Sequence, residues 1–167
     1  MIFSVFRNIN RFASRSKLLD AFAVFCAKYL LYLLIAFLLL DAVAVHNWRL
    51  FFCPLLSGLF AAFIINNIIY IFYKEHRPAK LESTKILISV PKNPSFPSRH
   101  ASFIFGMSFY LFFYSMPLAV FFIACSCFVG ISRVFSGVHW FHDILAGAFV
   151  GFASALIVYG LLNHIIL

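Results

Sequence analysis

The chain has 167 residues, of which 64% are hydrophobic and only 11% are charged, and its mean hydropathy is +1.00. Because soluble domains contain about 45–50% apolar residues, this composition excludes a water-soluble fold and indicates one integral membrane domain over residues 1–167. The formal net charge of +8 comes from cations beside apolar segments, so it favours contact with anionic lipids or a phosphorylated substrate and argues against a nucleic-acid partner.

Residues 1–17 predict a helix that lies on the membrane surface. Apolar residues recur there at roughly helical spacing, while Arg7, Arg11 and Arg15 repeat every four residues on another face. A basic amphipathic helix of this kind rests in the membrane interface instead of crossing it. We expect it to act as an anchor and not as a binding site.

Apolar segments fill most of the remaining chain, and a helix of about 20 residues suffices to cross the hydrocarbon. The predicted spans are residues 21–40, 50–73, 98–116, 117–135 and 139–162. The expected fold is therefore all-α, a bundle of about five transmembrane helices with an N-terminal interfacial helix. Lys28 interrupts the first span, where it either extends toward the interface or faces a polar partner within the bundle.

Three polar patches border these spans, and a basic loop of residues 79–97 lies between the first and second patches. If the chain crosses the membrane in alternating directions, four span ends lie on one side of the membrane. They are the end of the second span, the start of the third, the end of the fourth and the start of the fifth. The patches contain Arg77, then Ser98, Arg99 and His100, then Arg133, His139 and Asp143. Ionisable groups near hydrocarbon are costly, so their convergence favours catalysis or anion binding over simple packing.

His139 and Asp143 have the spacing of a reactive pair. Residues four apart share one face of a helix, and a carboxylate beside an imidazole fixes its tautomer and stabilises the imidazolium. The same face continues as Gly147, Gly151 and Ala155, a stripe of small residues typical of close helix packing. We therefore expect a histidine nucleophile or base on the face of the fifth helix that points into the bundle.

The other patch residues suit an anion. Arg77, Arg99 and Arg133 offer planar guanidinium groups that match phosphate oxygens, and the N-termini of the third and fifth helices direct free N–H groups to the same place. Ser98, the expected N-cap of the third helix, adds a hydroxyl group. His100 can donate a proton to a leaving oxygen, because its ordinary pKa suits acid–base work near neutral pH.

A zinc or iron site is the alternative interpretation of these histidines. Its ligands would be His76, His100, His139, His142 and Asp143. Membrane di-iron enzymes use about twice as many histidines, so we expect no metal.

The three patches resemble the signature of the type 2 phosphatidic acid phosphatase superfamily, which reads K-x6-R-P, then P-S-G-H, then S-R-x5-H-x3-D. The matching residues are Arg77-Pro78, then Pro97-Ser98-Arg99-His100, then Ser132, Arg133, His139 and Asp143. Two positions differ from the family pattern. Tyr70 occupies the lysine position, which Lys74 would partly replace, and Arg99 occupies the usual glycine position.

The resemblance implies a metal-independent lipid phosphatase without a cofactor. It implies that His139 is the nucleophile that forms a phosphohistidine, that Asp143 orients it, and that His100 protonates the leaving group and then activates water. The residues that would hold the substrate are Lys74, Arg77, Ser98, Arg99 and Arg133.

The short chain with one span before the second helix resembles the bacitracin-resistance type of undecaprenyl-pyrophosphate phosphatase. That type implies hydrolysis of undecaprenyl pyrophosphate to the monophosphate that carries cell-wall precursors, in the bacterial cytoplasmic membrane. The alternatives are a phosphatidate or phosphatidylglycerophosphate phosphatase, and a non-catalytic protein that binds anionic lipid. The complete set of His100, His139 and Asp143 argues against the last alternative.

The side of the membrane that carries the site is predicted differently by two arguments. All Lys and Arg residues except Lys28 and Arg49 lie on the side of the site and the N-terminus, which the positive-inside rule assigns to the cytoplasm. The family resemblance implies the extracytoplasmic side, and this is the orientation that we expect.

Overall fold

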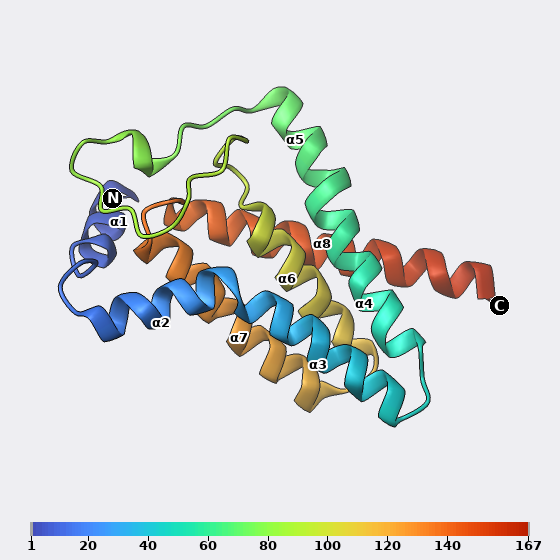
Figure 1. Ribbon diagram of the computed structural model, residues 1–167. Coiled ribbons are helices and arrows are strands. Elements are labelled where there is room, and N and C mark those ends of the chain that lie inside the picture. Colours follow the sequence, from blue (N-terminus) through green and yellow to red (C-terminus); the bar gives the residue numbers. More distant parts are fainter. Residues whose placement is uncertain (1, 167) are drawn as a thin grey trace.

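The computed structural model describes residues 2–166, and every regular element in this part of the chain is helical (Figure 1). The elements in order are α1 (Ile2–Asn10), α2 (Lys17–Lys28), α3 (Leu30–Ala44), α4 (Arg49–Leu59), a π-helix η1 (Phe60–Ile65), α5 (Asn66–Phe72), a 3-10 turn η2 (Pro78–Lys80), α6 (Arg99–Tyr110), a 3-10 turn η3 (Leu111–Phe113), α7 (Met116–Phe135) and α8 (Phe141–Ile166).

Three helices in the described part of the chain are long and apolar enough to cross a membrane: Arg49–Phe72, Met116–Phe135 and Phe141–His164. The pair α2 and α3 counts as a fourth if the two helices, bent by 52° at Tyr29, form one broken span. The expectation of an all-α membrane bundle is confirmed at this level. The third predicted span, residues 98–116, corresponds to α6, whose 12 residues are fewer than a crossing needs, so the count of five stays a prediction.

The N-terminal third differs from the predicted boundaries of 1–17 and 21–40. The first helix ends at Asn10, and α2 begins at Lys17 because Ser16 caps it by accepting a hydrogen bond from the backbone N–H of Leu19. The apolar face of α1 packs on the protein itself, where Phe6 is buried and meets the ring of Trp140 at a centroid distance of 5.0 Å.

The later boundaries lie near those predicted from sequence. Ser98 is the N-cap of α6 and accepts a hydrogen bond from Ala101 N–H, as predicted. Ser115 caps α7 in the same way, and α8 begins at Phe141, two residues later than expected. The second span is continuous from Arg49 to Phe72 but contains the π-helical turn η1.

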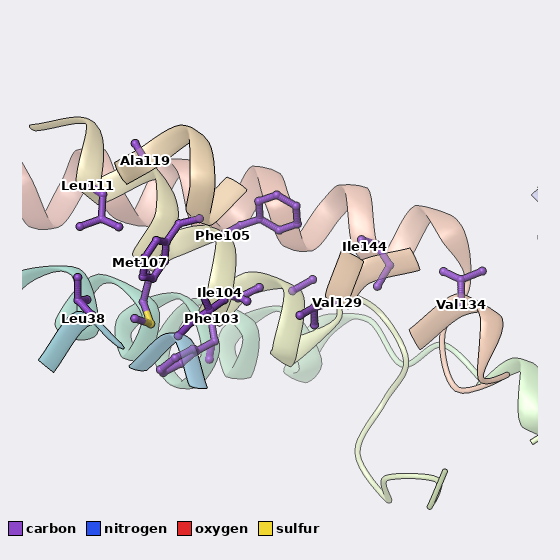
Figure 2. Packing of buried hydrophobic residues seen from close by; sticks show 14 of the residues in the cluster. Leu38, Phe103, Ile104, Phe105, Met107, Leu111, Ala119, Val129, Val134 and Ile144 are labelled. Carbon is purple, nitrogen blue, oxygen red and sulfur yellow. The ribbon is translucent and has the colours of Figure 1, made fainter. Parts of the chain in front are cut away.

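Helix α6 forms the centre of the bundle and packs against α4, α7 and α8 (Figure 1). Its buried residues meet apolar side chains from α3, α7 and α8 in the main core; Figure 2 labels Leu38, Phe103, Ile104, Phe105, Met107, Leu111, Ala119, Val129, Val134 and Ile144. Because nearly every face of α6 is covered, its N-terminus is held firmly at the end of the bundle where the polar patches lie.

Small residues set the spacing between α6 and its neighbours. A Cβ atom added at Gly151 would lie 2.5 Å from the backbone nitrogen of Gly106, and one added at Gly147 would lie 2.8 Å from Ala101 Cβ. Ala155 on the same stripe is also buried. The predicted stripe of small residues on the last helix therefore does face the bundle.

Substituting Gly151→Ala should separate α6 from α8 and lower the free energy of unfolding by about 1–3 kcal/mol, as overpacking does in other cores. Gly160→Ala on the same helix is the matched control, since a Cβ there meets no atom within 4 Å. Thermal unfolding in detergent measures both variants. Equal stability of the two would contradict the close packing at Gly151.

Candidate active site

The carboxylate of Asp143 lies fully buried where the three polar patches meet. Its Oδ2 atom accepts hydrogen bonds from three groups: the hydroxyl of Ser95, the backbone N–H of Trp140 and Nδ1–H of His139. The backbone carbonyl of Asp143 accepts a hydrogen bond from Ser98 N–H at 3.1 Å. One residue of α8 thus fixes the loop before α6, the start of α6 and the turn before α8.

His139 reaches Asp143 from the turn between α7 and α8, not from α8 itself. The spacing predicted a shared helix face, but α8 begins only at Phe141. The side chain of Asp143 turns back over the first turn of its helix, so that its Oδ2 lies 3.1 Å from His139 Nδ1. The predicted pairing is present, and a buried carboxylate at the helix N-terminus makes it.

The two ring nitrogens of His139 have different partners. With Nδ1 protonated and donating to Asp143, the lone pair of Nε2 faces Arg77 Nη1 at 3.0 Å. Burial lowers the pKa of His139 well below its ordinary value, and the charges of Arg133 and Arg77 lower it further. The ring is therefore neutral near pH 7, which is the state that an imidazole nucleophile or base needs.

Arg77 is buried between two loops, as its guanidinium group donates to three backbone carbonyl oxygens. Nη1 donates to Val138 at 2.8 Å, Nη2 to Pro94 at 3.0 Å and Nε to Asn93 at 3.1 Å. Burial lowers the pKa of Arg77, but an arginine with this many acceptors stays charged at neutral pH. Its charge therefore lies directly beside Nε2 of His139.

Arg133 and His100, whose charges act on His139, line a cavity of about 310 Å³. Arg133 is 3% exposed and donates from Nη1 to the carbonyl of Ala27, and its Nε has no hydrogen-bond partner among the described residues. His100 is the second residue of α6. A buried guanidinium group with an unused N–H, beside a helix N-terminus, can bind an anion.

The predicted substrate-binding residues do not all converge. Ser98 is buried at the start of α6. Arg99 instead reaches toward α5, where Nη2 donates to Asn67 Oδ1 at 2.8 Å and the guanidinium group lies over the ring of Tyr70. Lys74 is exposed and lines, together with Arg77, a separate cavity of about 550 Å³.

One group of possible metal ligands occurs in the described part of the chain: Glu75, His142 and Asp143, with ligand atoms within 4.8 Å of one another. His142 Nε2 lies 2.9 Å from Glu75 Oε2 and 3.4 Å from Asp143 Oδ1. His100 and His139, which the metal interpretation required, are not in this group. Three such ligands can hold zinc, although the other oxygen of Asp143 is already bound to His139.

Two polar residues of the site were not predicted from the sequence. The hydroxyl group of Ser95 donates a hydrogen bond to Asp143, and Glu75 contacts His142. Ser95 lies in a proline-containing loop without periodicity, so no pattern distinguishes it from its neighbours. Glu75 is an acidic residue next to the first patch, which is the one signal that the sequence offered.

Comparisons with known proteins show which family this chain resembles in sequence and which structures share its fold. A model of the PAP2 superfamily matches residues 51–166. The bacitracin transport permease protein BcrC of Bacillus licheniformis is 30% identical over 156 residues, which cover 92% of this chain and 77% of the relative.

Two solved structures share the fold. LpxE of Aquifex aeolicus has a TM-score of 0.73 and 24% identity, covering 95% of this chain and 94% of that one. A PAP2-type phosphatidylglycerolphosphate phosphatase of Bacillus subtilis has a TM-score of 0.64 and 21% identity, covering 98% and 87%. At these identities the likeness concerns the fold alone.

The burial of His139 predicts an unusual titration. The ring should stay neutral well below pH 6.5, the ordinary pKa of histidine, because burial and two arginines oppose protonation. A lowered pKa means that the unfolded chain binds the proton more readily. The stability that His139 contributes should therefore be complete above pH 6.5 and should decline as the pH falls below it.

Nitrogen-15 NMR of labelled histidines in detergent micelles measures this pKa, with a His139→Gln variant to assign the signal. The denatured chain is the control and should titrate near the ordinary value. Protonation of His139 close to pH 6.5 in the folded protein would contradict the buried geometry.

Proposed function

Because this chain belongs to the PAP2 superfamily and is a membrane phosphatase, we propose that it hydrolyses a lipid pyrophosphate, most of all undecaprenyl pyrophosphate, to the lipid monophosphate. The observation that carries the catalytic part is the neutral, buried His139 between Asp143 and Arg77. Support for the substrate comes from the resemblance of the sequence to the bacitracin-resistance type of phosphatase. It also comes from the relative whose name refers to bacitracin.

His139 Nε2 is the nucleophile in this proposal. It attacks the terminal phosphorus in line, the bond from phosphorus to the bridging oxygen breaks, and a phosphohistidine forms. Asp143 accepts the Nδ1–H bond throughout and stabilises the positive imidazole ring. His100 gives a proton to the leaving oxygen and then removes one from the water that hydrolyses the phosphohistidine.

The charge of the transferring phosphoryl group is stabilised by Arg77, Arg133 and the N–H groups at the start of α6, where Ser98 is the cap. Arg77 donates a hydrogen bond to His139 Nε2 before substrate binds. When the phosphate enters, it accepts this hydrogen bond in place of His139, and the lone pair of Nε2 becomes free. Arg99 and Lys74 contribute positive charge from farther out. The reaction consumes one water and yields lipid monophosphate and inorganic phosphate.

The runner-up substrates are phosphatidate and phosphatidylglycerophosphate. The same histidines can hydrolyse a phosphate monoester, and the fold likeness to a phosphatidylglycerolphosphate phosphatase does not select a headgroup. The non-enzymatic alternative, binding of anionic lipid without turnover, leaves the His139–Asp143 contact without a purpose.

The proposal includes five crossings of the bacterial cytoplasmic membrane, with α6 and η3 together as the third. These fifteen residues form a shorter crossing than their neighbours, and their burial by α4, α7 and α8 supports this placement. The site then lies at the end of the bundle that carries the N-terminus, on the extracytoplasmic side.

Replacing His139 with asparagine should lower phosphate release from undecaprenyl pyrophosphate at least about 10³-fold, because no other group supplies the nucleophile. His76→Ala is the matched control, since that side chain is exposed and bonds to Lys80. Acid quench of the wild-type protein should trap labelled phosphate on histidine. Wild-type rates in His139→Asn, or no trapped phosphate, would contradict the mechanism.

The same assay on phosphatidate and phosphatidylglycerophosphate decides the headgroup, and faster turnover of either would overturn the pyrophosphate assignment. Addition of a chelator should leave the rate unchanged. Activity that is lost with chelator and restored by zinc would favour metal chemistry at Glu75, His142 and Asp143.

The membrane orientation predicts which loops a membrane-impermeant thiol reagent reaches in intact cells. Glu82→Cys, exposed in the loop before α6, should be labelled, whereas Val45→Cys, exposed beyond α3 at the opposite end, should be labelled only after permeabilisation. The unsubstituted chain gives the background, as its cysteines lie within α2, α4 and α7. The reverse pattern would place the site in the cytoplasm.

A further inference from the structure

Lys28 lies at a break in an apolar segment and lines the cavity that Arg133 and His100 also line. Helix α2 ends at Lys28, α3 begins at Leu30, and the two are bent by 52°. The cavity of about 310 Å³ is lined by Lys28, Tyr29 and Tyr32 from this bend and by His100 and Arg133 from α6 and α7. A lysine so placed is costly in a membrane protein unless it has a partner or a ligand.

The position of Lys28 is fixed by its neighbours. Arg133 donates to the carbonyl of Ala27 at 3.2 Å, and Ala27 packs against Ile88 and Val138. The backbone beside Lys28 is thus attached to an arginine of the site, while the lysine side chain itself is exposed. No carboxylate in the described part of the chain forms an ion pair with it.

A pyrophosphate headgroup needs a second cationic position, because its two phosphates are bonded to each other and both are negative. The terminal phosphate must meet buried His139, beside Arg77 and Arg133. The second phosphate, which carries the lipid, then lies farther out in the cavity. Lys28 is the cation there, and an ammonium group on a flexible stem can follow a phosphate that differs in position between substrates.

Two other cations near the site, Arg99 and Lys74, are less suitable. Arg99 is held by Asn67 and lies against the rings of Phe63 and Tyr70, and it does not line this cavity. Lys74 lines the separate cavity of about 550 Å³ and not this one.

Resting on the proposed function, we propose that Lys28 binds the lipid-linked phosphate of a pyrophosphate and so determines the preference for pyrophosphates over phosphate monoesters. The phosphate that Lys28 binds is also the leaving group. Its negative charge increases as the bond to the terminal phosphorus breaks, and the lysine stabilises that charge while His100 supplies the proton. A monoester has no phosphate at this position, so Lys28 contributes little to its hydrolysis.

The test compares kcat/KM for farnesyl pyrophosphate and farnesyl phosphate. Lys28→Met should lower kcat/KM for the pyrophosphate about 10-fold or more, as the loss of a charge-assisted contact does, and change the value for the monophosphate less than about 3-fold. Lys28→Arg should keep most of the preference. Lys17→Met, at the other end of α2, is the control and should resemble wild type. Equal losses on both substrates with Lys28→Met would overturn the proposal.

Binding separates this proposal from the proposed function. The affinity of the His139→Asn chain for farnesyl methylenebisphosphonate, which is not hydrolysed, should fall about 10-fold when Lys28→Met is added, with unfolding temperatures showing that both chains fold. Unchanged affinity would overturn the role of Lys28 whatever the activity. If Lys28→Met lowers the affinity but the wild-type chain hydrolyses no pyrophosphate, Lys28 remains a binding residue. Only the proposed reaction is then overturned.

Discussion

The structure depends most on one buried carboxylate. Asp143 cannot remain in an apolar interior without hydrogen-bond donors, and it takes them from Ser95, His139 and Trp140. Its backbone carbonyl also holds Ser98 at the start of α6. Satisfying this charge therefore brings together segments that lie almost fifty residues apart in sequence. The same contacts fix the tautomer of the proposed nucleophile. The hydrogen bonds that stabilise this end of the bundle therefore also orient the ring of His139.

The buried arginines also have both a structural contact and a place in the proposed site. Arg77 joins the loop before α6 to the turn before α8 through three carbonyl groups, and Arg133 joins α7 to the end of α2. In the proposed reaction these groups also face the phosphate. Burial lowers the pKa of His139, and the positive charges of both arginines lower it further, so the ring stays unprotonated. The anion that these arginines attract is the group that His139 must reach in the proposed reaction. The same positive charges therefore help to keep the proposed nucleophile unprotonated and attract the proposed substrate.

The sequence predicted the family, the convergence of the three patches and the N-cap at Ser98, because motif spacing and span counting need only the order of residues. It could not predict that His139 precedes its helix, since the turn of Asp143 over the first turn of α8 depends on donors from other segments. The bend at Tyr29 was missed because hydropathy averages over a window and does not register a change in helix direction. The position of Arg99 against Tyr70 arises from tertiary packing alone.

Asn10 at the end of α1 has a consequence for biosynthesis. Its side-chain amide donates to the carbonyl groups of Lys85 and Phe135, which follow 75 and 125 residues later in the chain. Chains emerge from the ribosome with the N-terminus first, so α1 is made at the outset and must wait for nearly the whole protein before its partners exist. The loops around His139 can close only after α7 has entered the bilayer. The contacts of Asn10 therefore form only when most of the chain has been made.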